Sequence, residues 1–218
     1  MINPMREIID YLHDRTIEYN AGNPTISDEE WDARYLQLQD LEKETGYVYP
    51  DSPTQHINYE IVDSLNKYKH KYPMLSLGKT KSISEIQNYF GDQQYIVMTK
   101  LDGLSMSITY KNGELVSAAT RGNGEIGEDV LHNAMVIKSI PKEIDYKDEL
   151  IIDGEIICKY NDFKPWEEEY SNPRNFAAGS IRLLDSKECF NRNLSFYAWN
   201  IVKGFEDTNS VMDKFVKL

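Results

Sequence analysis

Two strand-like runs flank an Asn112-Gly113 pair, and no other feature constrains the fold of this chain as strongly. Apolar residues alternate with polar ones from Leu104 to Tyr110, and a second strand-like run extends from Leu115 to Arg121. Alternation with a period of two is typical of a strand with one buried face, and Asn-Gly favours the tight turn of a two-residue hairpin. We therefore expect an antiparallel hairpin.

The first sixty or so residues show helical periodicity instead. Ser27 and Glu30 form a capping box that opens a helix, and Gly46 suits the position just beyond its end. Larger side chains recur at helical spacing on both sides of a polar break, at Met5, Ile8, Ile9, Leu12, Thr16 and Tyr19 before it and at Trp31, Tyr35, Leu38 and Leu41 after it. These patterns predict a small helical hairpin.

The remainder of the chain mixes short strands and helices. Further strands are expected at 95–98, 149–158 and 194–202, and helices at 128–137, 161–170, 172–184 and 209–218. This mixture indicates an α+β fold with mixed or antiparallel sheets. We expect a helical domain with its connection at residues 1–65 and a second domain at residues 66–218.

The net charge of −12, from 24 basic and 36 acidic residues, argues against a general DNA-binding surface. With this balance, contact with DNA requires a local basic face or a partner. The sequence has no run of about 18 apolar residues to span a membrane, and its amino terminus lacks the apolar core of a signal peptide. Cys158 and Cys189 suit reduced thiols, so we expect a cytoplasmic protein.

The four residues Lys100-Leu101-Asp102-Gly103 precede the first strand of the hairpin. A lysine on rigid backbone beside a carboxylate and a glycine turn can act as a nucleophile. On its own, the same pattern also describes a surface lysine before a tight turn.

Other short motifs follow the lysine in a fixed order. Each has an ordinary structural explanation, because Arg-Gly-x-Gly is usually a turn and Asn-Pro commonly opens a helix. They are Thr120-Arg121-Gly122-Asn123-Gly124, Gly127-Glu128-Asp129, Asp153-Gly154-Glu155 and the run from Asn172 to Arg182.

In this order and spacing, the motifs resemble those of the NAD⁺-dependent DNA ligases of bacterial type. The resemblance extends from about residue 6 to the end and includes Pro73-Met74-Leu75-Ser76-Leu77 before the lysine motif. Residues Ile26 to Asp32 are similar to the amino-terminal nicotinamide-binding element of that family, and Asp51 to Gln55 resemble the connection that follows it.

The resemblance implies a helical domain that binds nicotinamide mononucleotide (NMN), then an adenylation domain with a nucleotidyltransferase (ATP-grasp-like) fold. Lys100 would attack the α-phosphate of NAD⁺, form a lysyl-AMP intermediate and expel NMN, for sealing of 5′-phosphate/3′-OH nicks in DNA replication and repair. Mg²⁺ is the implied metal and nicked double-stranded DNA the implied substrate, with no membrane partner.

The resemblance also implies roles around the adenylate. Asp102 would lie near the ribose or orient Lys100, and Arg121 would hold the ribose side. The other positions implied to contact the adenylate or its metal are Ser76 and Leu77 in the nucleotide pocket, Glu128 and Glu155 near the ribose and metal, and Trp199 stacked on adenine.

For the other half of NAD⁺, the family positions are Asp28, Trp31 and Asp32, with Tyr19 as a weaker candidate. Arg174 and Arg182 correspond to positions that approach phosphates of the nicotinamide half or of the nick.

The chain departs from the family pattern at several positions. Met98 stands where the family usually has a glutamate that reads the adenine amine, and Trp31 replaces a tyrosine. Glu18 and Tyr19 replace a tyrosine–histidine pair, and Asn123 replaces an aspartate.

Beyond the strand expected at 194–202, the family continues to two further lysine motifs, an OB-fold, a zinc module and later domains. The adenylation domain is therefore expected to be incomplete at its carboxy-terminal end. A second ligase subunit carrying the remaining motifs and OB-fold is one interpretation, and a truncated piece of a single-chain ligase is another. The alternatives from other classes are a non-catalytic adenylate-binding or scaffold module and a nucleotidyltransferase that uses ATP or GTP; the helical NMN-type element speaks against the last.

Overall fold

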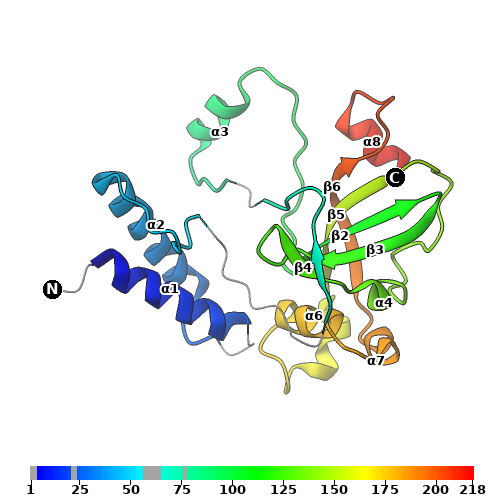
Figure 1. Cartoon of the computed structure of the whole chain (residues 1–218), viewed down its shortest axis with the longest axis horizontal. Coiled ribbons are helices and arrows are strands. Elements are labelled where there is room, and N and C mark those ends of the chain that lie inside the picture. Colours follow the sequence, from blue (N-terminus) through cyan, green and yellow to red (C-terminus); the bar gives the residue numbers. More distant parts are fainter. Residues whose placement is uncertain (1–3, 21–23, 56–64, 76–77) are drawn as a thin grey trace.

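The computed structural model describes residues 4–20, 24–55, 65–75 and 78–218 (Figure 1). The helices are α1 (Pro4–Asn20), α2 (Asp28–Thr45), α3 (Ile83–Phe90), α4 (Leu131–Ala134), α5 (Tyr160–Phe163), α6 (Pro173–Ile181), α7 (Ser186–Asn191) and α8 (Val211–Lys217), with a 3₁₀ turn at Lys164–Trp166. The strands are β1 (Lys67–Lys69), β2 (Leu104–Lys111), β3 (Glu114–Thr120), β4 (Ile126–Glu128), β5 (Leu150–Ile157) and β6 (Ser195–Lys203). The α+β expectation is confirmed.

Helices α1 and α2 form the expected hairpin, with a hydrophobic cluster of their own. Ser27 is the N-cap of α2 and accepts a hydrogen bond from the backbone N–H of Glu30 at 3.2 Å. Gly46 ends the helix with a positive φ of 67°, as the sequence predicts. The buried residues between the helices are Met5, Ile8, Ile9, Leu12 and Leu38.

The main sheet has the strand order β3-β2-β5-β6, and every neighbouring pair is antiparallel. The expected hairpin joins β2 to β3, and its turn residues Asn112 and Gly113 both have positive φ, at 53° and 85°. Positive φ at both positions is the type I′ geometry that Asn-Gly favours.

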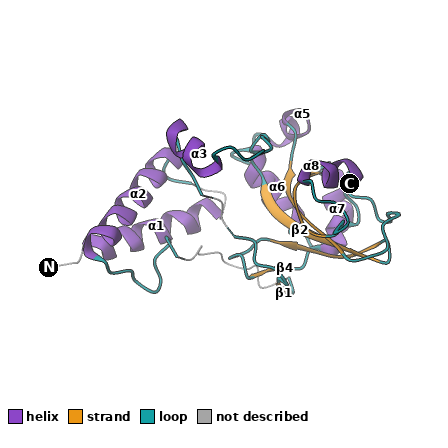
Figure 2. Ribbon diagram, turned by 90° about the horizontal axis from the view of Figure 1, so that it is seen from above, coloured by secondary structure: helices purple, strands orange, loops and turns teal. Residues whose placement is uncertain are grey.

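The two faces of the sheet differ in polarity. Met106, Ile108 and Tyr110 of β2 are buried in the main core, to which α4, α6 and α7 also contribute on that side of the sheet (Figures 1 and 2). On the opposite face, Ser105 pairs across the strands with Glu155, and Ser107 pairs with Asp153. The alternation in β2 therefore supplies a core face and a polar face.

A short segment from β1 to Met74 runs beside the loop that follows β3. Strand β1 pairs with β4, the backbone N–H of His70 donates to the carbonyl of Glu125 at 2.8 Å, and that of Met74 donates to the carbonyl of Gly124 at 2.9 Å. These bonds connect residues before the lysine motif to the Arg-Gly-x-Gly loop.

The strand expected at 95–98 is wrong, and α3 was not expected. The ring of Tyr95 stacks on Phe90 of α3 at 4.8 Å, and Val97 is 83% exposed. Residues 95–98 pair with none of the strands of the main sheet. An apolar, β-branched run forms a strand only where a neighbouring strand can pair with it.

Several other helices begin or end at residues different from those expected from the sequence. Residues 128–137 contain the end of β4 and the one-turn helix α4, and the helix expected at 161–170 begins at Tyr160 and becomes a 3₁₀ turn. Helix α6 ends at Ile181, three residues before the expected Leu184. No helix in the described ranges is long and apolar enough to cross a membrane.

Candidate active site

The lysine motif forms the loop that leads into β2. Lys100 and Gly103 stand at either end of the loop, and Lys100 is exposed. A β-carbon added at Gly103 would lie 2.0 Å from the carbonyl oxygen of Ile156 in β5, so only glycine fits at this position. The glycine thereby fixes the lysine loop against the neighbouring strand.

Glu155 of β5 lies close to this loop. Its carboxylate accepts a hydrogen bond of 2.9 Å from the hydroxyl of Ser105. Burial raises the pKa of Glu155, while the positive charges of Arg174, Lys100 and Arg121 act to lower it. Three of the cations singled out from the sequence therefore converge on one carboxylate.

Arg121 follows β3 directly. Its backbone N–H donates to the carbonyl of Ser105 at 2.9 Å, and burial lowers the pKa of its guanidinium, opposed by the charge of Glu155. Gly122 has a φ of 56°, and a β-carbon there would lie 1.9 Å from the carbonyl oxygen of Ile126. The glycine allows the tight turn that holds Arg121 on the polar side of the sheet.

Arg174, in the first turn of α6, is one of the cations whose charge acts on Glu155. Asn172 caps this helix by accepting a hydrogen bond from the backbone N–H of Asn175 at 2.8 Å. The guanidinium of Arg174 donates to the carboxylate of Asp102 at 2.8 Å. Burial alone would lower the pKa of Arg174, but Tyr19, Asp102 and Glu155 raise it above its ordinary value.

The amino-terminal hairpin reaches the same cluster through Tyr19. The ring centroid of Tyr19 lies 5.2 Å from the Arg174 guanidinium carbon. Burial raises the pKa of Tyr19; the charge of Arg174 opposes this, and those of Asp28 and Asp102 reinforce it. The structure thus places Tyr19 against Arg174, with Asp28 and Asp102 near enough for their charges to act on Tyr19.

Two other residues expected at the nicotinamide half have partners of their own. The carboxylate of Asp32 forms an ion pair with the ammonium group of Lys79 at 3.2 Å. The indole N–H of Trp31 donates to the hydroxyl of Thr16 at 3.2 Å, and its ring stacks on Tyr35 at 5.2 Å. Trp31 is therefore packed within the helical hairpin in this conformation.

Glu128 and Arg182 form a buried ion pair. Glu128 is fully buried, and its carboxylate accepts from Arg182 at 2.7 Å and from Thr120 at 3.0 Å. Burial lowers the pKa of Arg182 to about 10. The pair joins β4 to the end of α6, so both side chains support the fold in this conformation.

Trp199 is half-buried on β6, where the pairing with β5 shifts. Asp153 pairs with Asn200 and Gly154 pairs with Ala198, which leaves Trp199 in the irregular step between them. Ser76 and Leu77 lie outside the described residues.

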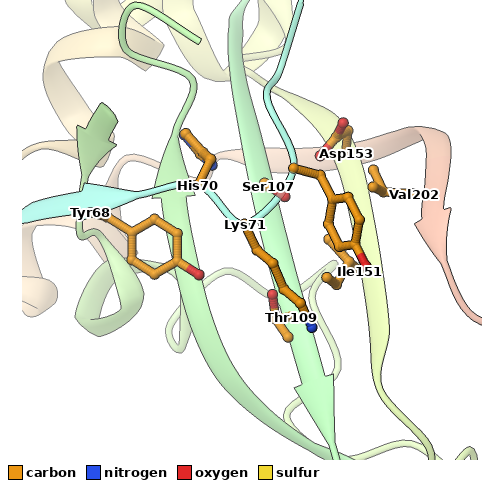
Figure 3. A pocket seen from close by; sticks show the side chains of 9 residues that line it. Tyr68, His70, Lys71, Ser107, Thr109, Ile151, Asp153 and Val202 are labelled. Atoms are coloured by element: carbon orange, nitrogen blue, oxygen red, sulfur yellow. The ribbon is translucent and has the colours of Figure 1, made fainter. Parts of the chain in front are cut away.

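A small pocket lies on the polar face of the sheet, beneath the segment that follows β1 (Figure 3). His70 and Asp153 line it together with Ser107 and Thr109. Burial raises the pKa of Asp153, opposed by hydrogen bonds from Ser107 and Asn200 and by the charge of His70. No role was expected for His70 or Ser105. For Ser105 the signal was the polar half of the alternation in β2.

Three His, Cys, Asp or Glu side chains do not come together as a metal site anywhere in the part of the chain that the structure describes. Mg²⁺ commonly takes only one or two protein carboxylates and completes its shell with water and substrate phosphates. Glu155 could supply such a carboxylate, because it lies on the polar face of the sheet beside the strand that the Lys100 loop enters.

Comparisons with known proteins find matches over nearly the whole chain. Residues 3–58 match the DNA ligase-like, N-terminal NAD⁺-binding domain, and residues 62–217 match the NAD-dependent DNA ligase adenylation domain. A DNA ligase of Ruminiclostridium cellulolyticum is 41% identical over 211 residues, covering 93% of this chain and 32% of that protein. One from Lachnoclostridium phytofermentans is 43% identical over 185 residues, covering 82% and 28%.

The chain thus spans about a third of the length of the curated relatives that it matches. The two family models together account for nearly all of its residues, and the larger one contains Lys100, Arg121, Glu155 and Arg174. The chain belongs to the NAD-dependent DNA ligase family and comprises its N-terminal NAD⁺-binding and adenylation domains.

Proposed function

We propose that this chain performs the lysine-adenylation step of NAD⁺-dependent DNA ligation. The amine of Lys100 attacks the α-phosphorus of NAD⁺, so that a nitrogen–phosphorus bond forms. The bond from that phosphorus to the bridging oxygen breaks, and NMN leaves with the electron pair. The observation that supports this proposal is that Arg174 holds Asp102, two residues from Lys100, at 2.8 Å, while the charges of Arg174, Lys100 and Arg121 all act on Glu155.

The cations around Lys100 supply what this reaction needs. Phosphoryl transfer depends mainly on positioning and on stabilisation of charge at the phosphate oxygens. Arg121 and Arg174 offer guanidinium groups for those oxygens, while Arg174 also holds Asp102 beside the nucleophile. Glu155 is the carboxylate for the ribose hydroxyls or for Mg²⁺, and the metal would offset pyrophosphate charge when bound.

The nicotinamide half of NAD⁺ is assigned to the amino-terminal hairpin. Arg174 contacts this hairpin through Tyr19, so a dinucleotide with its α-phosphate at Lys100 can extend toward the hairpin. Asp32 then exchanges its contact with Lys79 for a contact with NMN. In this arrangement the guanidinium of Arg174 lies between the AMP and nicotinamide halves of NAD⁺, where the pyrophosphate is expected.

Nick sealing, with its roles in DNA replication and repair, belongs to the assembled ligase. The net charge of −12 leaves this chain without a general cationic surface for DNA. We propose that the sequence corresponding to the rest of the relatives, on a second subunit or on the same polypeptide, supplies the remaining adenylation motifs and the grip on nicked DNA.

Isotope transfer tests the proposed step. The purified chain is incubated with Mg²⁺ and NAD⁺ labelled either in the AMP half or in the nicotinamide half, alone and with a polypeptide matching the rest of a relative. Label from the AMP half should become covalently bound to the protein through a bond that survives mild alkali and is cleaved by acid. Label from the nicotinamide half should not become bound, and Lys100→Ala should abolish the transfer. Lys187→Ala, at an exposed lysine of α7, is the matched control. Transfer that persists in Lys100→Ala would overturn the proposal.

A further inference from the structure

Arg174 is held from two directions by residues that are far apart in the sequence. From one side the carboxylate of Asp102, in the lysine loop, accepts its hydrogen bond at 2.8 Å. From the other side the ring of Tyr19, at the end of α1, lies 5.2 Å from its guanidinium carbon. Arg174 therefore connects the helical hairpin to the loop that contains Lys100.

The contact with Tyr19 has the geometry of a cation–π interaction. A guanidinium within about 6 Å of an aromatic ring centroid is attracted by the negative face of the ring, more strongly when water is excluded. Tyr19 and Arg174 are both partly buried. The interaction uses the aromatic ring and does not require the phenol hydroxyl.

We propose that Tyr19 is a positioning residue that couples the amino-terminal hairpin to the Lys100 loop through Arg174. In this role Tyr19 acts on the rate of lysine adenylation, whereas the family resemblance places it among residues that bind the nicotinamide half. The inference rests on the proposed function for its kinetic consequence, but its structural consequence can be measured without NAD⁺.

The structural consequence follows from the order of the contacts. Removing the Tyr19 ring frees one side of Arg174, and the bond from Arg174 to Asp102 then loses part of its fixed orientation. The loop at 100–103 should open more often, although Tyr19 does not belong to it. The helical hairpin should keep its stability, because its buried cluster is made by other residues of α1 and α2.

Hydrogen exchange of the ligand-free chain is the first test. Tyr19→Leu should speed amide exchange in the peptide that contains residues 100–103 about fivefold, the change expected for loss of a cation–π contact of ordinary strength. Tyr19→Phe keeps the ring and should restore the wild-type exchange rate of this peptide. Tyr11→Leu is the matched control, because Tyr11 lies on the same helix and under Arg15 and Arg34 instead.

Adenylation kinetics provide the second test. Tyr19→Leu should lower the rate of AMP transfer at saturating NAD⁺ about fivefold, with a smaller change in the NAD⁺ concentration for half-maximal rate, and Tyr11→Leu should leave both unchanged. If Tyr19→Leu changes only that half-maximal concentration, Tyr19 is a direct ligand of NAD⁺ and the coupling is wrong. Unchanged loop exchange in Tyr19→Leu also overturns it. Failure of wild-type adenylation, by contrast, contradicts the proposed function while the exchange test still decides the coupling.

Discussion

The guanidinium of Arg174 donates a hydrogen bond of 2.8 Å to the carboxylate of Asp102, although 72 positions separate the two residues in the sequence. This contact connects the first turn of α6 to the loop between Lys100 and β2. In the proposed mechanism it lets Arg174 orient the nucleophile as well as offer charge to phosphate.

Replacing Arg174 by alanine should reduce the rate of Lys100 adenylation by about a hundredfold, comparable to the loss of one charge-stabilising donor in other active sites. The loss should exceed that of Asp102→Asn, which keeps an oxygen acceptor for the guanidinium. Single-turnover measurements of AMP transfer give both rates. Arg34→Ala, on the exposed side of α2, is the control, and a rate for Arg174→Ala equal to that of this control would remove Arg174 from the mechanism.

Gly103→Ala should strongly reduce the rate of AMP transfer while changing the free energy of unfolding only a little. The added methyl would lie 2.0 Å from the Ile156 carbonyl, so the loop must move away from β5. Near-attack geometry tolerates little displacement. Gly91 has a φ of 54° and open space around the added carbon, so Gly91→Ala should lose stability through backbone strain without a specific loss of AMP transfer. An active Gly103→Ala variant would show that the position of this loop is not critical.

Glu128→Ala should destabilise the fold by about 3 kcal/mol, because it breaks a buried ion pair. The partner, Arg182, lies 2.7 Å from the Glu128 carboxylate. Urea denaturation measures the free energy of unfolding, and Glu125→Ala in the same loop serves as the exposed control. A stable Glu128→Ala chain that has lost only adenylation would return Glu128 to the binding role that the family resemblance implies.

Glu149 should make stability sensitive to acid. Lys203 and Lys71 hold its carboxylate at 2.7 Å and lower its pKa from 4.5 to about 2. A carboxylate whose pKa is lower in the folded state contributes stability that is complete above about pH 4.5 and is lost as the pH falls toward about 2. The contribution is modest because the lysines are solvent-exposed.

The test compares urea midpoints of the wild type and Glu149→Gln at pH 6 and pH 3. The advantage of the wild type should be present at pH 6 and smaller at pH 3. An advantage that is the same at both values would contradict the assignment of this carboxylate.

Local signals in the sequence predicted the fold where local chemistry decides it. The Asn112-Gly113 turn, the Ser27 cap of α2 and the Asn172 cap of α6 were all found as expected, because each depends on a few adjacent residues. The run at 95–98 was misassigned because its pattern is that of a strand, whereas its state depends on whether a neighbour is free to pair with it.

The sequence predicted a set of candidate site residues but not the contacts that they make. The motifs named Lys100, Arg121, Glu155 and Arg174, and the structure brings these together. Nothing in the spacing indicated that Arg182 would be buried against Glu128 rather than exposed to phosphate. That outcome depends on where the end of α6 meets β4, which is a property of the tertiary packing.

The identity of the adenylated residue tests the account most directly. After incubation with NAD⁺ and Mg²⁺ in the presence of the remaining ligase sequence, the chain is digested at neutral to mildly alkaline pH and its peptides are fragmented by tandem mass spectrometry. The account predicts one AMP group, attached to the side-chain nitrogen of Lys100 in the peptide that continues into β2. AMP on another lysine, with Lys100 unmodified, would contradict it.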